Sequence, residues 1–101
     1  MSRKFKPPHP GEILAETVLR EHGGISVTAF ANRLKMTRTA ISRVVNGKAG
    51  VSPELSIRLE EALATSAESW LAMQSAYDLW QAKKRHKTKI VRIRAIETES
   101  A

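Results

Sequence analysis

The side chains best suited to chemistry lie between residues 37 and 48, where hydroxyl, amide and guanidinium groups recur at helical intervals. Arg38 and Ser42 are four residues apart, as are Thr39 and Arg43, so a helix would carry all four on one side. An arginine can donate two hydrogen bonds to guanine O6 and N7, and hydroxyl or amide groups can bond to phosphates or base edges. This chemistry is recognition of double-stranded DNA, and the candidate contact residues are Thr37, Arg38, Thr39, Ser42, Arg43, Asn46 and Lys48.

Two short helices joined by a tight turn must position this row of side chains. Ser26 can cap a helix over residues 27–34, and Thr37 can cap a second helix that runs to about Val45. A small residue is needed where two such helices cross, and Ala31 stands there. The apolar residues expected to pack on the inner side of the pair are Phe30, Ala31, Leu34, Ile41 and Val44.

Three further helices are predicted around this pair. Residues 11–22 form the first, and Gly23-Gly24 ends it. Residues 52–54 begin a fourth helix, since a capping serine, a proline and an acid follow in that order. Residues 65–68 match the capping-box pattern and predict a fifth helix from residue 67 to about residue 84. The predicted fold class is therefore all-α with five helices.

The fifth helix carries an unusual aromatic face for so small a domain. Such a face favours association with a second copy, because a large apolar patch left exposed usually marks an interface. The alternative is that it covers the domain's own core. The candidate interface residues are Trp70, Met73, Tyr77 and Trp80.

Charge and composition limit the classes of partner that the chain is expected to bind. The chain of 101 residues has a formal net charge of +7, which favours a polyanion such as nucleic acid. Residues 33–48 and 83–94 contain basic residues and no acid. The chain has no cysteine, which fits the reducing cytoplasm, and no apolar run long enough to span a membrane.

The chain is expected to divide into an N-terminal arm (residues 1–8), a DNA-binding and dimerisation domain (residues 9–84) and a basic tail (residues 85–101). Apolar and basic residues alternate over residues 90–96, which predicts a short strand in the tail. A basic tail without regular structure is the alternative.

Enzyme chemistry finds little support. His9, His22 and His86 lie where the arm meets the domain, at a helix end and in the tail, so no catalytic group or metal-ligand cluster assembles from the spacing. Glu12 and Glu16 are four apart, as expected of a solvated helix face. We expect no catalytic residues, no metal and no cofactor.

Residues 27–47 resemble the helix-turn-helix of the lambda-repressor-like superfamily. The resemblance extends to residues 9–14, 51–59 and 70–80, which are similar to the HigA-type antitoxins, also called the virulence-associated protein I family. Together these segments lie within residues 9–84, and their combination is more specific than the helix-turn-helix alone.

The resemblance implies a five-helix fold, a homodimer formed largely through the last helices, and binding to a palindromic operator. It further implies repression of the chain's own operon and neutralisation of a RelE-like toxin that cuts mRNA. The third-helix residues would then face the bases, and Asn46 and Lys48 the DNA backbone. A helix-turn-helix repressor without a toxin partner has the same fold and stays open as the alternative, as does a module that binds only protein.

The sequence departs from the family at two places. Lys35 stands where the turn commonly has glycine, and a left-handed conformation there would cost about 1–2 kcal/mol. The tail from about Arg85 onward matches nothing in the family.

Overall fold

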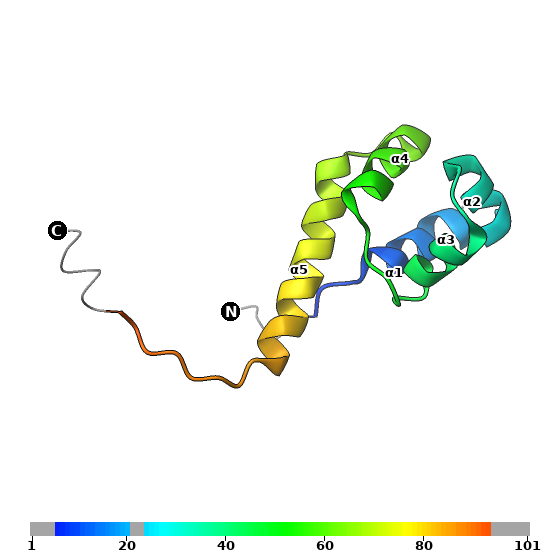
Figure 1. Cartoon of the computed structure of the whole chain (residues 1–101). Helices are drawn as coiled ribbons and strands as arrows, with labels where there is room; N and C mark the ends of the chain where they lie inside the picture. The colour runs from blue at the N-terminus through cyan, green and yellow to red at the C-terminus, as the bar shows by residue number, and fades with distance from the viewer. Residues whose placement is uncertain (1–5, 21–23, 94–101) are drawn as a thin grey trace.

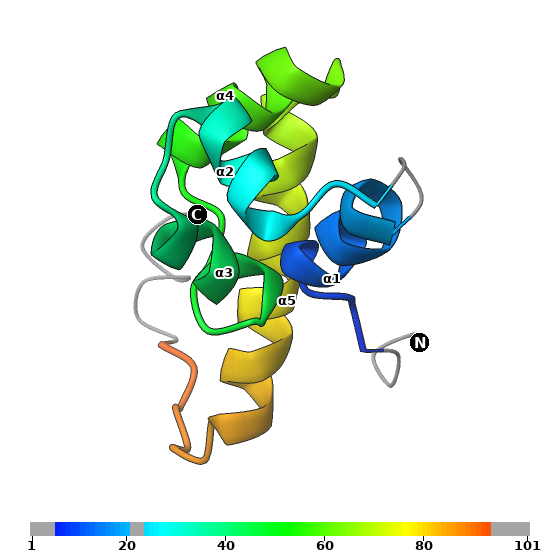
Figure 2. The ribbon, with the colours of Figure 1, turned by 90° about the vertical axis from the view of Figure 1, so that its right-hand side faces the viewer.

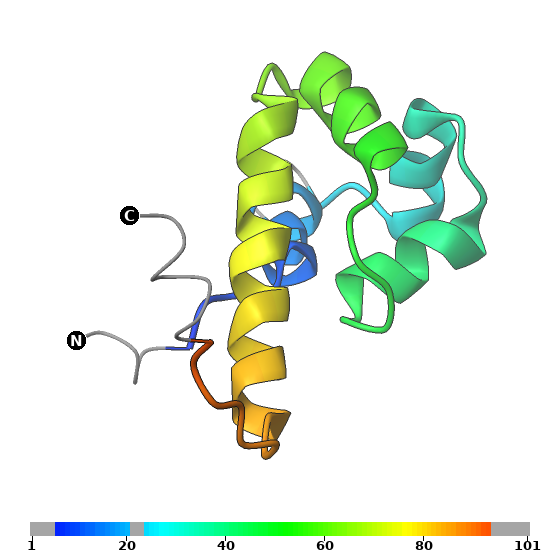
Figure 3. The same cartoon turned by 60° about the vertical axis from the view of Figure 1, so that its left-hand side comes forward.

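The computed structural model describes residues 6–20 and 24–93, and within them it contains helices and no strand. In chain order these are α1 (Pro10–Leu14), the π-helix η2 (Ala15–Arg20), α2 (Val27–Leu34), α3 (Arg38–Val45), α4 (Pro53–Leu63) and α5 (Ala67–Arg85). The long helix α5 runs along one side of the molecule, and the shorter helices gather against it (Figure 1; Figure 3). Since η2 continues α1 without a break, this arrangement confirms the predicted all-α, five-helix fold.

A single apolar core joins the helices. Figure 2 shows α1, α2 and α3 in front of α5, with α4 crossing above them. The indole N–H of Trp70 donates to the Thr65 hydroxyl at 2.7 Å, so this buried aromatic residue keeps its polar atom bonded. The buried apolar residues are Leu14, Val18, Phe30, Ala31, Leu34, Ile41, Val44, Val51, Leu55, Leu59 and Trp70.

The start of α1 is fixed against the end of α3. His9 is buried and its Nδ1 accepts a hydrogen bond from the Gly11 N–H at 2.9 Å, which caps the helix. Pro10 occupies the first turn, where its missing N–H costs nothing. Any Cβ on Gly11 would overlap the Val44 carbonyl oxygen, so only glycine permits this approach. This contact holds the first helix against the end of α3.

The first helix differs from its prediction over residues 11–22. It begins at Pro10, is α-helical only to Leu14, and continues as η2 to Arg20. Within this stretch the Thr17 hydroxyl donates at 2.7 Å to the Ile13 carbonyl four residues earlier. The predicted end at Gly23-Gly24 falls largely outside the described residues.

The other helices begin and end close to their predictions. α2 and α3 match theirs, and α4 begins at Pro53 behind the capping Ser52. α5 ends one residue later than predicted, and its cap is Ser66, which accepts from the Ser69 N–H at 3.0 Å. The capping-box reading is therefore wrong in register, because the hydroxyl of Thr65 is bound to Trp70 instead.

Beyond α5, residues 86–93 are extended and exposed. The strand predicted over residues 90–96 is wrong for residues 90–93, and residues 94–96 lie outside the described range. An alternating pattern makes a strand only where a neighbouring strand pairs with it. Within the described residues, no helix is long and apolar enough to cross a membrane.

Candidate DNA-binding surface

The turn between α2 and α3 sets the orientation of the candidate recognition helix. Ser26 and Thr37 cap the two helices by accepting from the N–H of Ala29 and Ala40, at 3.0 and 3.1 Å. Between the helices Lys35 adopts φ 58° and ψ 43°, the left-handed conformation that costs a residue with a Cβ about 1–2 kcal/mol. The turn therefore keeps the conformation that a glycine would adopt, and other contacts must hold it.

Arg58 of α4 holds this turn, and sequence reasoning missed it. Its Nη1 donates to the carbonyl oxygens of Leu34 and Lys35, both at 2.9 Å, while its Nε donates to Glu54 at 2.9 Å. The guanidinium thus satisfies two carbonyls that the end of α2 leaves without helical partners. In the sequence, Arg58 is recognisable only as a polar residue of α4 that lies four positions after Glu54. Nothing in the sequence indicates that it bonds to the carbonyls of Leu34 and Lys35, which are 24 and 23 residues away.

The loop after α3 is held against α5. Gln74 of α5 is buried, and its Oε1 accepts from the Val51 N–H at 2.8 Å. A Cβ on Gly50 would meet the Gln74 amide at 3.0 Å, so the loop passes close to α5. Of the two loop glycines, Gly47 has a positive φ of 74°. Lys48 is therefore carried on a loop that is fixed at both ends.

The outward side of α3 presents the predicted residues together. Thr37, Arg38, Thr39, Arg43 and Lys48 are exposed, while Ile41 and Val44 of the same helix are buried. Ser42 is half-buried, and Asn46 is the residue that ends the helix. The structure therefore brings all seven candidates to α3 and the loop that follows it.

Both arginines of this surface are tethered to the protein. Arg38 Nε donates to the Thr28 hydroxyl of α2 at 2.9 Å, and Arg43 Nη2 donates to the Lys48 carbonyl at 3.1 Å. Each bond uses one of the five N–H donors of a guanidinium, which leaves enough for a bidentate contact. Thr28 belongs to the surface although its position in the sequence gave no reason to select it.

Asn46 is turned toward its own helix. Its Nδ2 donates to the Ser42 carbonyl at 2.8 Å and lies 3.3 Å from the Ser42 hydroxyl. In this arrangement its amide closes the end of α3, and a contact with DNA would use its remaining polar groups.

The aromatic face of α5 is divided between core and surface. Trp70 is 4% exposed and belongs to the protomer's own core, which corrects its assignment to an interface. Met73 packs against the core, and the Tyr77 ring meets the His9 ring edge-on at 4.9 Å. Trp80 is half-buried, while Leu79 is 55% exposed.

Comparison with known proteins places this geometry in a family. A model described as helix-turn-helix matches residues 18–70, so the chain belongs to the helix-turn-helix family. Among its relatives is virulence-associated protein A of Dichelobacter nodosus, 39% identical over 80 residues, which are 78% of this chain and 78% of that protein. Antitoxin HigA-1 of Vibrio cholerae is 35% identical over 83 residues, 82% of this chain and 77% of that protein.

A solved structure extends the comparison to a complex. PA4674 of Pseudomonas aeruginosa, in complex with its operator DNA, has a TM-score of 0.77 and 35% identity, covering 94% of this chain and 95% of that one. Within the helix-turn-helix family, the chain belongs to the HigA-type, virulence-associated group that its sequence resembles. Among the described residues, no cluster of His, Cys, Asp or Glu could hold a metal ion.

Proposed function

We propose that this chain is the DNA-binding antitoxin of a toxin–antitoxin pair, which represses its own operon from a palindromic operator. One observation carries the proposal: α3 is capped, locked at its preceding turn by Arg58, and turned outward with tethered arginines. A helix held in this way can enter the major groove without a large loss of conformational freedom. A relative of similar fold is bound to its operator.

Each candidate residue takes a role that its position supports. Arg38, Thr39, Ser42 and Arg43 face the bases together with Thr37, because they lie on the outer side of α3 or at its start. Lys48 and Asn46 follow the helix and contact phosphates, which fixes the register of α3 in the groove.

The active form is a homodimer joined along α5. Tyr77 and Trp80 are half-buried in the protomer, and Leu79 exposes a large apolar side chain beside them. Met73 lies on the same side as Tyr77 and Trp80, and a second copy would bury what remains exposed of these residues. Two copies related by a two-fold axis match a palindromic operator, since each presents one α3.

The toxin partner is expected to be a RelE-like mRNA-cleaving protein. HigA-1, a relative, carries the name of an antitoxin, which supports this role. The division into an arm (residues 1–8), a domain (residues 9–84) and a basic tail (residues 85–101) is part of this proposal; the cap of α1 at His9 and the end of α5 at Arg85, one residue beyond the proposed boundary, support it. The site of action is the nucleoid of the bacterial cytoplasm.

The test is binding of the purified chain to DNA from its own promoter region and to a scrambled duplex of equal length, over a range of salt. We expect the promoter to be preferred by at least ~10³-fold, with two protomers per site. Arg38→Ala should cost ~1–3 kcal/mol on the promoter and relax the preference at one base pair. Lys48→Ala should weaken both duplexes alike and reduce the salt slope by about one unit.

Equal binding to both duplexes would refute sequence-specific repression. The toxin role is tested separately, by co-purification with a RelE-like protein encoded beside this chain and by loss of its mRNA cleavage. Promoter binding without either effect would identify the alternative, a helix-turn-helix repressor that has no toxin partner.

A further inference from the structure

The net charge of the protein is carried by one short stretch of the chain. Residues 83–94 contain seven lysines and arginines and no acid. Residues 6–82, which include the whole helix-turn-helix, contain eight basic and eight acidic residues and so have no net charge. The two basic residues before residue 6 cancel the two acids after residue 94, so the formal charge of +7 equals that of residues 83–94.

Part of this charge has a structural explanation and part does not. Lys83, Lys84 and Arg85 lie in the last turn of α5, where cations are favoured by the helix dipole. Lys87 and Lys89 follow the helix and are exposed, beyond the last turn in which the dipole acts most strongly. These two cations therefore call for another explanation.

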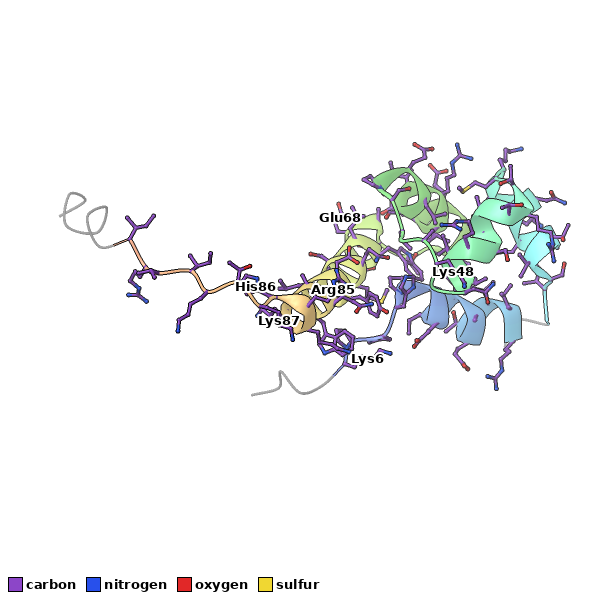
Figure 4. All side chains as sticks on the ribbon, turned by 60° about the horizontal axis from the view of Figure 1, so that its bottom comes forward. Lys6, Lys48, Glu68, Arg85, His86 and Lys87 are labelled. Atoms are coloured by element: carbon purple, nitrogen blue, oxygen red, sulfur yellow. The ribbon has the colours of Figure 1, made fainter. Side chains whose placement is uncertain are left out.

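A cation from the start of the chain also lies near the end of α5. The Lys6 and Lys84 ammonium groups lie 5.6 and 4.5 Å from the centroid of the same Trp80 ring. Figure 4 shows Lys6 near Arg85 and Lys87 at this end of the molecule. We call this region the basic end; it consists of Lys6, Lys83, Lys84, Arg85, Lys87, Lys89 and Arg92.

A polyanion is the partner that this charge density fits. Six cations within residues 83–92 repel one another, and a partner of dense negative charge relieves the repulsion. Duplex DNA carries one negative charge per about 1.7 Å of its axis, whereas a protein surface mixes both signs. DNA is therefore favoured over an acidic protein.

The length of the chain beyond α5 makes this contact possible. Arg92 lies seven residues beyond Arg85, and when extended this stretch spans up to about 23 Å at roughly 3.3 Å per residue. The molecule measures 25 and 24 Å along its two shorter axes. The basic end can thus reach phosphates while α3 occupies the groove.

We propose that the basic end is a second DNA-contacting element, which binds backbone phosphates without reading sequence and supplies much of the electrostatic attraction of a domain that is otherwise neutral. This inference rests on the proposed DNA-binding function. The two elements then have different roles: α3 discriminates between sequences, and the basic end attracts any duplex.

The test compares three full-length proteins on the promoter duplex and on the scrambled duplex. The charge variant is Lys87→Gln, Lys89→Gln and Arg92→Gln, and the matched control is Ile90→Ser and Ile93→Ser in the same segment. The slope of log K against log salt changes by about 0.9 for each phosphate contact. The charge variant should therefore flatten the slope by up to about 2.7 per bound protomer on both duplexes, and the control should leave it unchanged.

The ratio of promoter to scrambled affinity should be the same for all three proteins, since phosphate contacts carry no sequence information. A slope that is unchanged in the charge variant, or flattened equally in the control, overturns the proposal. An unchanged slope combined with loss of toxin binding would assign the basic end to a protein partner instead. Failure of the proposed function would give a different result, because the wild-type protein itself would then bind the promoter and the scrambled duplex equally well.

Discussion

Arg58→Ala is the sharpest test of how the recognition helix is held. The substitution removes two hydrogen bonds from one guanidinium nitrogen to the carbonyls of Leu34 and Lys35, together with the ion pair to Glu54. Hydrogen bonds to a charged group contribute ~1.5–3 kcal/mol each when they are well shielded. The Arg58 side chain is 35% exposed and water can replace part of the loss, so we expect about 2 kcal/mol for the pair.

The ion pair should contribute little of this effect. The Glu54 side chain is 66% exposed, and surface pairs four apart on a helix give at most about 0.5 kcal/mol. Glu54→Gln is therefore the matched control, because it removes the pair and keeps the bonds to the turn. Arg58→Lys should retain part of the stability, since a single ammonium can still reach a carbonyl but lacks the planar fork.

The assay is thermal unfolding followed by circular dichroism. For a domain of this size 1 kcal/mol shifts Tm by about 4–8 °C, so Arg58→Ala should lower Tm by roughly 8–16 °C. Glu54→Gln loses the ion pair and the interaction of a first-turn acid with the α4 dipole, about 1 kcal/mol together, and should lower Tm by at most about 8 °C. Promoter affinity, measured well below both transitions, should fall by about 3–10-fold for Arg58→Ala because α3 is less well oriented. If both variants shift Tm equally, the bonds to the turn do not stabilise it.

Three further substitutions test the geometry. Lys35→Gly should stabilise the protein by about 1 kcal/mol in urea unfolding, because glycine adopts φ 58° without the Cβ clash; a loss of stability would contradict the strain. Gly11→Ala should cost ~2–3 kcal/mol or more in the same assay, since its Cβ overlaps the Val44 carbonyl, and a neutral result would show that α1 moves freely. Trp80→Ala should weaken the dimer at least tenfold in sedimentation velocity while helix content stays the same; an unchanged dimer would remove Trp80 from the interface.

The fold was largely predictable because its signals are local. Capping residues and the spacing of apolar residues located α2, α3 and the start of α4 to within a residue. The π-helix was not predictable, because over six residues its wider turns leave no clear signal in the apolar spacing. The cap of α5 was misplaced by one residue, at Thr65 instead of Ser66. The Thr65 hydroxyl accepts a hydrogen bond from the Trp70 indole, and the sequence pattern does not reveal this contact.

The candidate site was predictable in its exposed side chains and not in what orients them. The spacing of apolar residues identifies the buried side of α3, and the opposite side must then be exposed. The contacts that fix it, from Arg58, Thr28 and Gln74, join residues 10 to 24 positions apart. No periodicity reports such pairs, because each depends on how two helices meet in space.

The tethered arginines and the uneven charge lead to one conclusion about specificity. Because Arg38 and Arg43 are already bonded to Thr28 and to the Lys48 carbonyl, each would lose little rotamer freedom in the base contact that the proposed function assigns to it. The same bonds limit its ability to adapt to a wrong base, which would leave guanidinium donors unpaired in the groove. Residues 6–82 have no net charge, so the general attraction that they add is confined to the cations of residues 33–48. Attraction supplied from the separate basic end can then vary, for example with salt, without changing which sequence α3 prefers.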